Sequence, residues 1–155
     1  MHHRPLILKL SFMQLVNRIG LVVIGCAVAL SSMAVRADVV AVVSSKSSIT
    51  TLTKNQVIDI FLGRRIRFPD GSPALPIDQA EGSAMRDEFY DRFANMSPAL
   101  IKAFWSKIIF TGRGRPPQAM ANGAEAKKFV TANVNTIGYI DRSMVDSDVK
   151  VVLAP

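Results

Sequence analysis

The sequence is poor in the side chains that carry most catalytic and metal chemistry. It has one cysteine and two histidines, and all three lie within the first 26 residues, at Cys26, His2 and His3. The rest of the chain therefore has no cysteine for a disulfide and no cysteine or histidine for a zinc site. It also lacks a histidine general base and a thiol nucleophile. These absences argue against an enzyme, and they predict that the protein uses no metal or other cofactor.

Acidic residues are missing from the first 37 positions, where Arg4, Lys9, Arg18 and Arg36 supply four of the 19 basic residues. All 12 acids follow this segment, so residues 38–155 carry 15 basic against 12 acidic side chains, a net charge of +3 and not the +7 of the whole chain. Long runs of Lys and Arg are absent, as are the spacings of RNP motifs and zinc fingers. The sequence therefore predicts no nucleic-acid partner.

The longest apolar run near the N-terminus covers residues 19–30, which is 12 residues. A membrane-spanning helix needs roughly 20. The run follows a basic start and precedes the small residues Val35 and Ala37, and these three parts are typical of a secretory signal. The sequence predicts a cleavable signal peptide over residues 1–37 and a periplasmic domain over residues 38–155. A retained membrane anchor is one alternative, and lipidation at Cys26, within Val23-Ile24-Gly25-Cys26, is another.

Strand and helix patterns alternate beyond residue 37. The β-branched run over 39–43 indicates a buried parallel strand, and further strands are expected over 74–78, 137–140 and 149–153. Such alternation indicates an α/β domain with a mixed or mostly parallel sheet.

Helix starts are indicated by capping residues. Thr53 and Gln56 form a capping box for a helix that begins near Lys54 and ends at Gly63. Further helices are expected after Ser83, after Asn122 and at Ser97-Pro98. The helix that opens at Ser97-Pro98 carries apolar residues at helical spacing and is expected to be the main core helix; these residues are Leu100, Ile101, Phe104, Trp105, Ile108 and Ile109.

Two polar loops are candidates for binding an anion. The turn at Gly82-Ser83 opens a helix, whose unpaired N–H groups and positive dipole end suit an anion, with Arg86 in the first turn. The serine loop over 44–48 follows a buried strand, where open α/β sheets bind ligands. The structural alternatives are that Ser83 is only an N-cap, that Arg86 pairs with Glu81 or Asp91, and that the serine loop is only a connector.

The segment 111–115, with two arginines and two glycines, is more typical of a solvated loop than of a nucleotide-binding loop, because the spacing of a P-loop is missing. Arg64, Arg65 and Arg67 form a basic cluster. They indicate either a solvated face or a docking patch for an acidic partner.

The order of several segments resembles a known family. These segments are DIFLG at 59–63, a Pro-Asp-Gly turn at 69–71, the Gly-Ser helix start at 82–83, a helix bearing tryptophan, and TIGYI at 136–140. In this order they resemble the phosphate-binding periplasmic substrate-binding proteins of ABC transporters, in the form of a short, stand-alone member. The resemblance implies an α/β fold of the type 2 periplasmic-binding-protein kind: a single lobe with a mixed sheet flanked by helices.

The resemblance also implies where the ligand would lie. In the family an arginine precedes an Asp-Gly-Ser-Gly-Thr run, and the serine, glycine and threonine of that run touch phosphate. Gly82 and Ser83 match this pattern, whereas Gln79 stands at the arginine position and Ala84 and Met85 replace the second glycine and the threonine. Contacts from the loop after the first strand would come from the serine loop. The expected anion-binding residues are therefore Ser44, Ser45, Gln79, Gly82, Ser83, Ala84 and Arg86.

The expected function is the periplasmic binding of a small oxyanion such as phosphate, with a membrane transporter or a sensor as the partner. The alternative is an envelope adaptor or a sensor accessory that docks a protein partner through the cluster of Arg64, Arg65 and Arg67.

Overall fold

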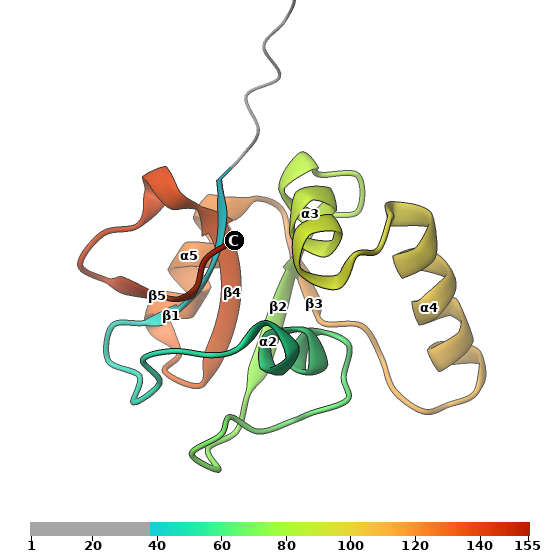
Figure 1. Ribbon diagram of the computed structural model, residues 1–155, viewed down its shortest axis with the longest axis horizontal. Coiled ribbons are helices and arrows are strands. Elements are labelled where there is room, and N and C mark those ends of the chain that lie inside the picture. Colours follow the sequence, from blue (N-terminus) through green and yellow to red (C-terminus); the bar gives the residue numbers. More distant parts are fainter. Residues whose placement is uncertain (1–37) are drawn as a thin grey trace, which may run out of the picture. The chain divides into compact units, whose positions relative to one another are not determined.

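The computed structural model describes residues 38–155, which form an α/β domain (Figure 1). The predicted signal peptide and Cys26 lie outside the described residues. Within residues 38–155, no helix has the length and the apolar character needed to span a bilayer. In chain order the elements are β1 (Val39–Ser44), α2 (Lys54–Phe61), β2 (Leu75–Gln79), α3 (Ala84–Phe89), the π-helix η1 (Tyr90–Ala94), α4 (Pro98–Phe110), β3 (Gln118–Met120), α5 (Gly123–Ala132), β4 (Thr136–Asp141), the 3₁₀-helix η2 (Arg142–Met144) and β5 (Val149–Leu153).

The five strands form one mixed sheet in the order β3-β2-β4-β1-β5, which confirms the predicted fold class. β2 is parallel to β3 and β4. The prediction that the first strand is parallel was wrong, because β1 runs antiparallel to both of its neighbours, β4 and β5. All six residues of β1 are buried, as its apolar run indicates. Such a run reports burial on both faces of a sheet and carries no information on the direction of the neighbouring strands.

Helices cover both faces of the sheet (Figure 1). On one face, Val39, Ala41 and Tyr139 join a large apolar cluster with residues of α2, α3 and α4. On the other face, Val40, Val42 and other strand residues pack against α5. A Cβ atom at Gly138 in β4 would lie 3.0 Å from a side-chain atom of Val130 of α5, so the close approach of this helix to the sheet favours glycine at that position.

The helix starts agree with their predicted caps. Thr53 and Gln56 make both bonds of the capping box, and α2 is followed by Gly63 with a φ of +68°. Ser83, Ser97 and Asn122 each accept a hydrogen bond from a first-turn N–H of the helix that they open. The short strand β3 had no sequence signal, since its three residues are too few to show a period.

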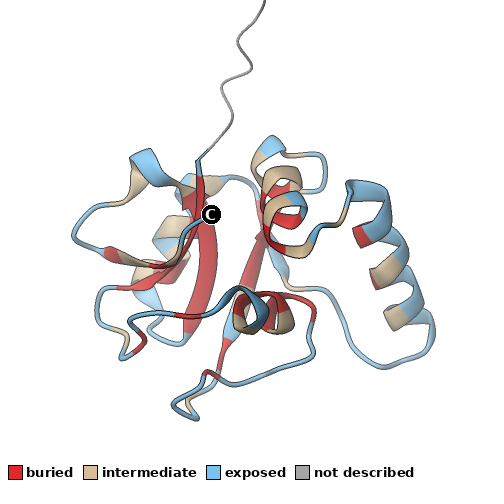
Figure 2. Cartoon of the chain, in the orientation of Figure 1, coloured by how far each residue is buried: buried red, intermediate tan, exposed pale blue. Residues whose placement is uncertain are grey.

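The prediction that α4 is the main core helix was wrong. Ile101 and Trp105 are buried, but Leu100, Ile109 and Phe110 are exposed by 54%, 56% and 93%. Most of α4 therefore faces solvent, as its colours in Figure 2 show. Apolar spacing indicates which residues share a helix face, and it does not show how much of that face another element covers.

Candidate functional site

The predicted anion-binding turn follows the C-terminal end of β2, at the start of α3. Gly82 is exposed and has a φ of +84°, a conformation that favours glycine. The Ser83 hydroxyl oxygen accepts a hydrogen bond from the Arg86 N–H at 3.2 Å. The Ser83 N–H donates to the Ala80 carbonyl at 3.1 Å. Ser83 is therefore the N-cap that the sequence predicts.

The first turn of α3 leaves donors available. An α-helix has no acceptor of its own for its first N–H groups, and within residues 38–155 no other group accepts from the N–H of Ala84 or Met85. Ala84 is exposed and Ser83 is half-buried. The Ser83 hydroxyl proton is also free to donate, because its oxygen serves as the acceptor in the cap. A small anion at this turn would meet two backbone donors and one hydroxyl.

Arg86 does not face this turn as a free cation. Its guanidinium is buried and donates from Nε to Oδ2 of Asp78 at 3.0 Å. The Tyr90 hydroxyl donates to the same oxygen at 2.9 Å, and the Tyr139 hydroxyl donates to Asp78 Oδ1. The Gln79 N–H adds a fourth donor to Oδ1 at 2.8 Å. The carboxylate of Asp78 thus takes the position of an anion inside the protein, and the alternative partners Glu81 and Asp91 are not the ones that Arg86 uses.

The electrostatics of this cluster follow from burial and from the Asp78 charge. Burial opposes the charged guanidinium, but the neighbouring Asp78 carboxylate outweighs it and raises the pKa of Arg86. Burial, followed by the same carboxylate, raises the pKa of Tyr90 and of Tyr139 above the usual value. Both phenols are therefore held as neutral donors to Asp78.

The chain contains only two tyrosines, Tyr90 and Tyr139, so their ionisation can be read directly. We expect the folded protein to show almost no tyrosinate absorbance at about pH 10–11, where tyrosines of the urea-unfolded chain ionise. Because the folded-state pKa is the higher one, the stabilisation is fully present below about pH 10 and is lost as the pH rises above it. A spectrophotometric titration with and without urea measures this. Superimposable titration curves would contradict the buried cluster.

The serine loop lies at the other end of the sheet. Val43 of β1 pairs with Ile137 near the start of β4, and Leu75, the first residue of β2, pairs with Thr136. Ser44 is therefore level with the start of β2, whereas Gln79 is at its end, about 13 Å further along the strand direction. Ser44 is buried, with its hydroxyl directed to the Thr131 carbonyl at 3.4 Å, and Ser45 is exposed.

The structure thus brings together part of the expected site. Gly82, Ser83 and Ala84 form the turn, whereas Ser44 and Ser45 are remote from it. The Gln79 side chain is buried and donates to the Tyr139 carbonyl at 3.0 Å. Asp78 and Tyr90 were not singled out from the sequence. The available signal was a lone acid directly after the apolar residues Leu75, Pro76 and Ile77, eight residues before an arginine.

Comparison with solved structures shows a fold shared with substrate-binding proteins. A protein from Clostridium perfringens of the phosphate ABC transporter substrate-binding type, solved with bound phosphate, matches with a TM-score of 0.60 and 22% identity, over 75% of this chain and 44% of that one. An ABC-type phosphate transport receptor from Vibrio cholerae matches with a TM-score of 0.59 and 18% identity, over 75% of this chain and 45% of that one. PstS from Borrelia burgdorferi matches with a TM-score of 0.56 and 14% identity, over 75% and 46%.

At these identities the likeness establishes the fold, that of a periplasmic-binding-protein-like lobe. The chain spans less than half the length of each of these three proteins. Neither a family model nor a curated protein sequence matches it.

Proposed function

We propose that this protein is a periplasmic binding module for a small oxyanion such as phosphate, held at the turn formed by Gly82, Ser83 and Ala84. The observation that carries the proposal is the shared fold with phosphate-binding receptors, one of which was solved with phosphate bound. The exposed N–H groups at the start of α3 support it, because a helix start favours an anion. Residues 1–37 are its export signal, and a membrane transporter is its partner.

The proposed site differs from the one expected from the sequence in three respects. Ser44 and Ser45 are not part of it, because they lie at the opposite end of the sheet. The Gln79 side chain is not part of it either, because it is buried and donates to the Tyr139 carbonyl. Arg86 helps to position the turn but adds little net positive charge to the site, because the Asp78 carboxylate already neutralises its guanidinium. Binding then rests on backbone donors and the Ser83 hydroxyl, which remain open to water. We expect a dissociation constant in the millimolar range, about −4 kcal/mol.

A titration of the ¹⁵N-labelled protein with phosphate and with sulfate, at constant ionic strength, tests the proposal. We expect saturable shifts of the amide signals of residues 82–86. Ser83→Ala removes a hydroxyl donor, and we expect it to weaken binding by about fivefold or more. Ser97→Ala is the matched control, because it deletes an equivalent N-cap at α4. Each variant loses about 1 kcal/mol of stability, but only the first should lose affinity.

The absence of a saturable shift with either anion at about ten times the expected dissociation constant would contradict the proposal. Equal loss of affinity in Ser83→Ala and Ser97→Ala would show that the effect is one of stability and not of binding.

The second candidate function is an envelope adaptor or sensor accessory that docks a protein partner. The basic cluster of Arg64, Arg65 and Arg67 supports it through one of its members. Arg64 pairs with Asp59 at 3.5 Å, and Arg67 donates to the Gly71 carbonyl at 2.7 Å. Among the described residues, the Arg65 side chain has no such partner, and it is exposed.

A further inference from the structure

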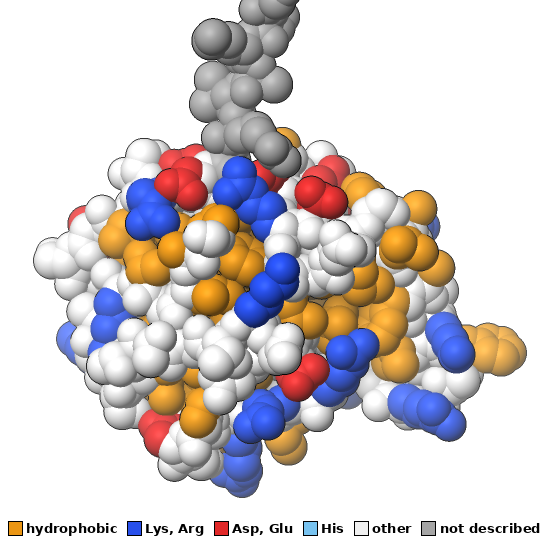
Figure 3. All heavy atoms as spheres, viewed as in Figure 1, with side chains coloured by type: hydrophobic (Ala, Val, Ile, Leu, Met, Phe, Trp, Pro, Cys, Tyr) orange, Lys and Arg blue, Asp and Glu red, His pale blue; other side chains and the backbone are white. Residues whose placement is uncertain are grey.

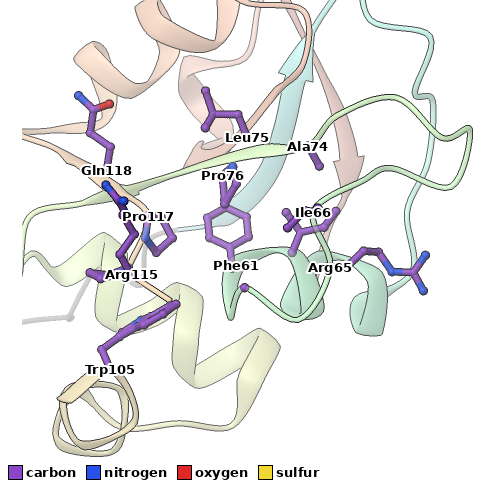
Figure 4. Close-up of a pocket in the computed structure, with 13 residues that line it drawn as sticks. Phe61, Arg65, Ile66, Ala74, Leu75, Pro76, Trp105, Arg115, Pro117 and Gln118 are labelled. Atoms are coloured by element: carbon purple, nitrogen blue, oxygen red, sulfur yellow. The ribbon is translucent and has the colours of Figure 1, made fainter. Parts of the chain in front are cut away.

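A cleft of about 510 Å³ lies beside the end of α2, the start of β2 and the segment between α4 and β3 (Figure 4). Ile60 and Phe61 form a buried apolar base, and Trp105 of α4 forms one wall. Ile66 and Leu75 also line the cleft, although they are exposed by 73% and 49%. The cleft lies at the start of β2, whereas the Gly82-Ser83 turn follows the end of that strand, so the cleft is distinct from the proposed oxyanion site.

Trp105 lines the cleft with its ring and also carries a buried donor without a partner among the described residues. The residue is 6% exposed, and its Nε1–H has no acceptor in the part of the chain that the structure describes. A buried N–H without a partner is unfavourable, and tryptophan at a binding surface usually donates this hydrogen bond. A ligand oxygen would reach this buried N–H only if the indole shifted, whereas the ring itself already offers apolar surface to an occupant.

The charged side chains that line the cleft are all basic. Arg65 and Arg115 line it, and no acidic side chain does. Both arginines are exposed, and neither has an ion-pair partner among residues 38–155. In Figure 4, Arg115 stands beside Trp105 and Pro117, whereas Arg65 lies beyond Ile66 and extends away from the cleft. On the face drawn in Figure 3, Lys and Arg side chains likewise border exposed hydrophobic surface.

Two prolines next to the cleft have no N–H to donate to an added strand. Pro116 and Pro117 lead into β3, which is an edge strand of the sheet, and proline has no N–H to donate. Recognition of an occupant therefore rests mainly on the side chains that line the cleft.

We propose that the cleft docks an extended segment of a partner protein in which an apolar side chain is flanked by acidic residues. The apolar side chain fills the cleft against Phe61 and Trp105, and the flanking acids meet Arg65 and Arg115. The positions of the two arginines favour a chain over a small molecule, because Arg65 points away from the cavity that a small ligand would fill. Ile66 and Leu75 extend the apolar surface beyond the cavity, where a chain would also cover them. This inference deepens the docking function and does not depend on oxyanion binding.

The chain has one tryptophan, so a single indole N–H signal reports on the cleft. The probe is a synthetic capped peptide of sequence Glu-Leu-Glu-Phe-Glu, titrated into the ¹⁵N-labelled full chain. We expect a saturable shift of the indole signal that weakens as salt is raised. A matched peptide with lysine in place of every glutamate should cause no shift. Equal shifts with both peptides, or none with either, would overturn the proposal.

Charge-reversal variants distinguish recognition of the acidic residues from nonspecific binding of the peptide. The double variant Arg65→Glu/Arg115→Glu changes two exposed residues and should weaken binding of the acidic peptide at least about tenfold. Arg113→Glu is the matched control, since this exposed arginine lies in the same loop as Arg115 but does not line the cleft. We expect it to change affinity by less than about twofold. The amide spectrum checks that each variant is folded. Equal losses in the double variant and the control would contradict specific docking.

Other occupants give different outcomes. A tighter, saturable shift with octanoate than with the acidic peptide would overturn the assignment in favour of a small amphipathic carboxylate. If the indole signal shifted with protein concentration in the absence of peptide, the assignment would be overturned in favour of a second copy of the chain. Ser83→Ala should leave peptide binding unchanged, so failure of the oxyanion site and failure of the cleft are distinguishable.

Discussion

Replacement of Asp78 by alanine is expected to lower the free energy of unfolding by about 3–5 kcal/mol, because breaking a buried ion pair leaves an uncompensated charge. Asp78 is 3% exposed, and its carboxylate accepts hydrogen bonds from the Arg86 guanidinium and from the hydroxyls of Tyr90 and Tyr139. Its removal leaves a buried cation and two buried phenols without their acceptor. Urea unfolding followed by far-ultraviolet circular dichroism measures the change.

Two controls separate the charge from the shape of Asp78. Asp78→Asn keeps the size of the side chain but cannot neutralise Arg86, so we expect it to lose much of the same stability. Arg64→Ala breaks an exposed pair with Asp59, whose side chains are 58% and 36% exposed, and should cost less than about 1 kcal/mol. The buried ion pair would be refuted as a source of stability if Asp78→Ala cost no more than Arg64→Ala.

Phe89→Ala is expected to cost about 3–5 kcal/mol, the usual loss when a fully buried phenylalanine is truncated. Phe89 is 0% exposed and lies at the centre of the aromatic part of the core. Its ring stacks on Tyr139, with centroids 4.1 Å apart and planes at 8°, and lies 4.7 Å from the Phe61 ring. The deletion creates a cavity next to the residues that hold Asp78, so the loss of packing also loosens the buried cluster.

The matched control for this substitution is Phe110→Ala, at the end of α4. Phe110 is 93% exposed, so its truncation removes little buried surface, and we expect a change within about 0.5 kcal/mol. The comparison also tests the position of α4, which carries this ring out into solvent. If the two variants were equally destabilised, Phe110 would have to be buried in the folded protein.

Sequence patterns predicted the structure correctly where the interaction joins residues within a few positions of one another. The capping box at Thr53 and the N-caps at Ser83, Ser97 and Asn122 depend on contacts within one turn, and all of them are present in the structure. The apolar run of β1 likewise indicated a buried strand. Its direction in the sheet depends on partners from residues 136–141 and 149–153, and no local pattern encodes that choice.

The candidate site was predictable only in part for the same reason. The Gly-Ser turn is a short segment, and its position at the start of a helix followed from the sequence. The net charge beside that turn did not follow from the sequence, because the guanidinium of Arg86 could pair with any nearby carboxylate. The structure pairs it with Asp78, which lies on the preceding strand and is buried, and not with the nearby Glu81 or Asp91. The distance between the serine loop and the turn also depends on strand direction.

The sequence by itself determined the composition of residues 38–155, which have no cysteine or histidine and a net charge of +3, and the order of their longer strands and helices, with β3 missed. These are properties of single residues and of short segments. Only the tertiary structure decided that Arg86 is neutralised by Asp78, that Trp105 lies in a cleft with Arg65 and Arg115, and that Ser44 is remote from Ser83. The physical reason is that each of these relations joins residues from different elements, and the packing of the sheet and helices sets which side chains meet.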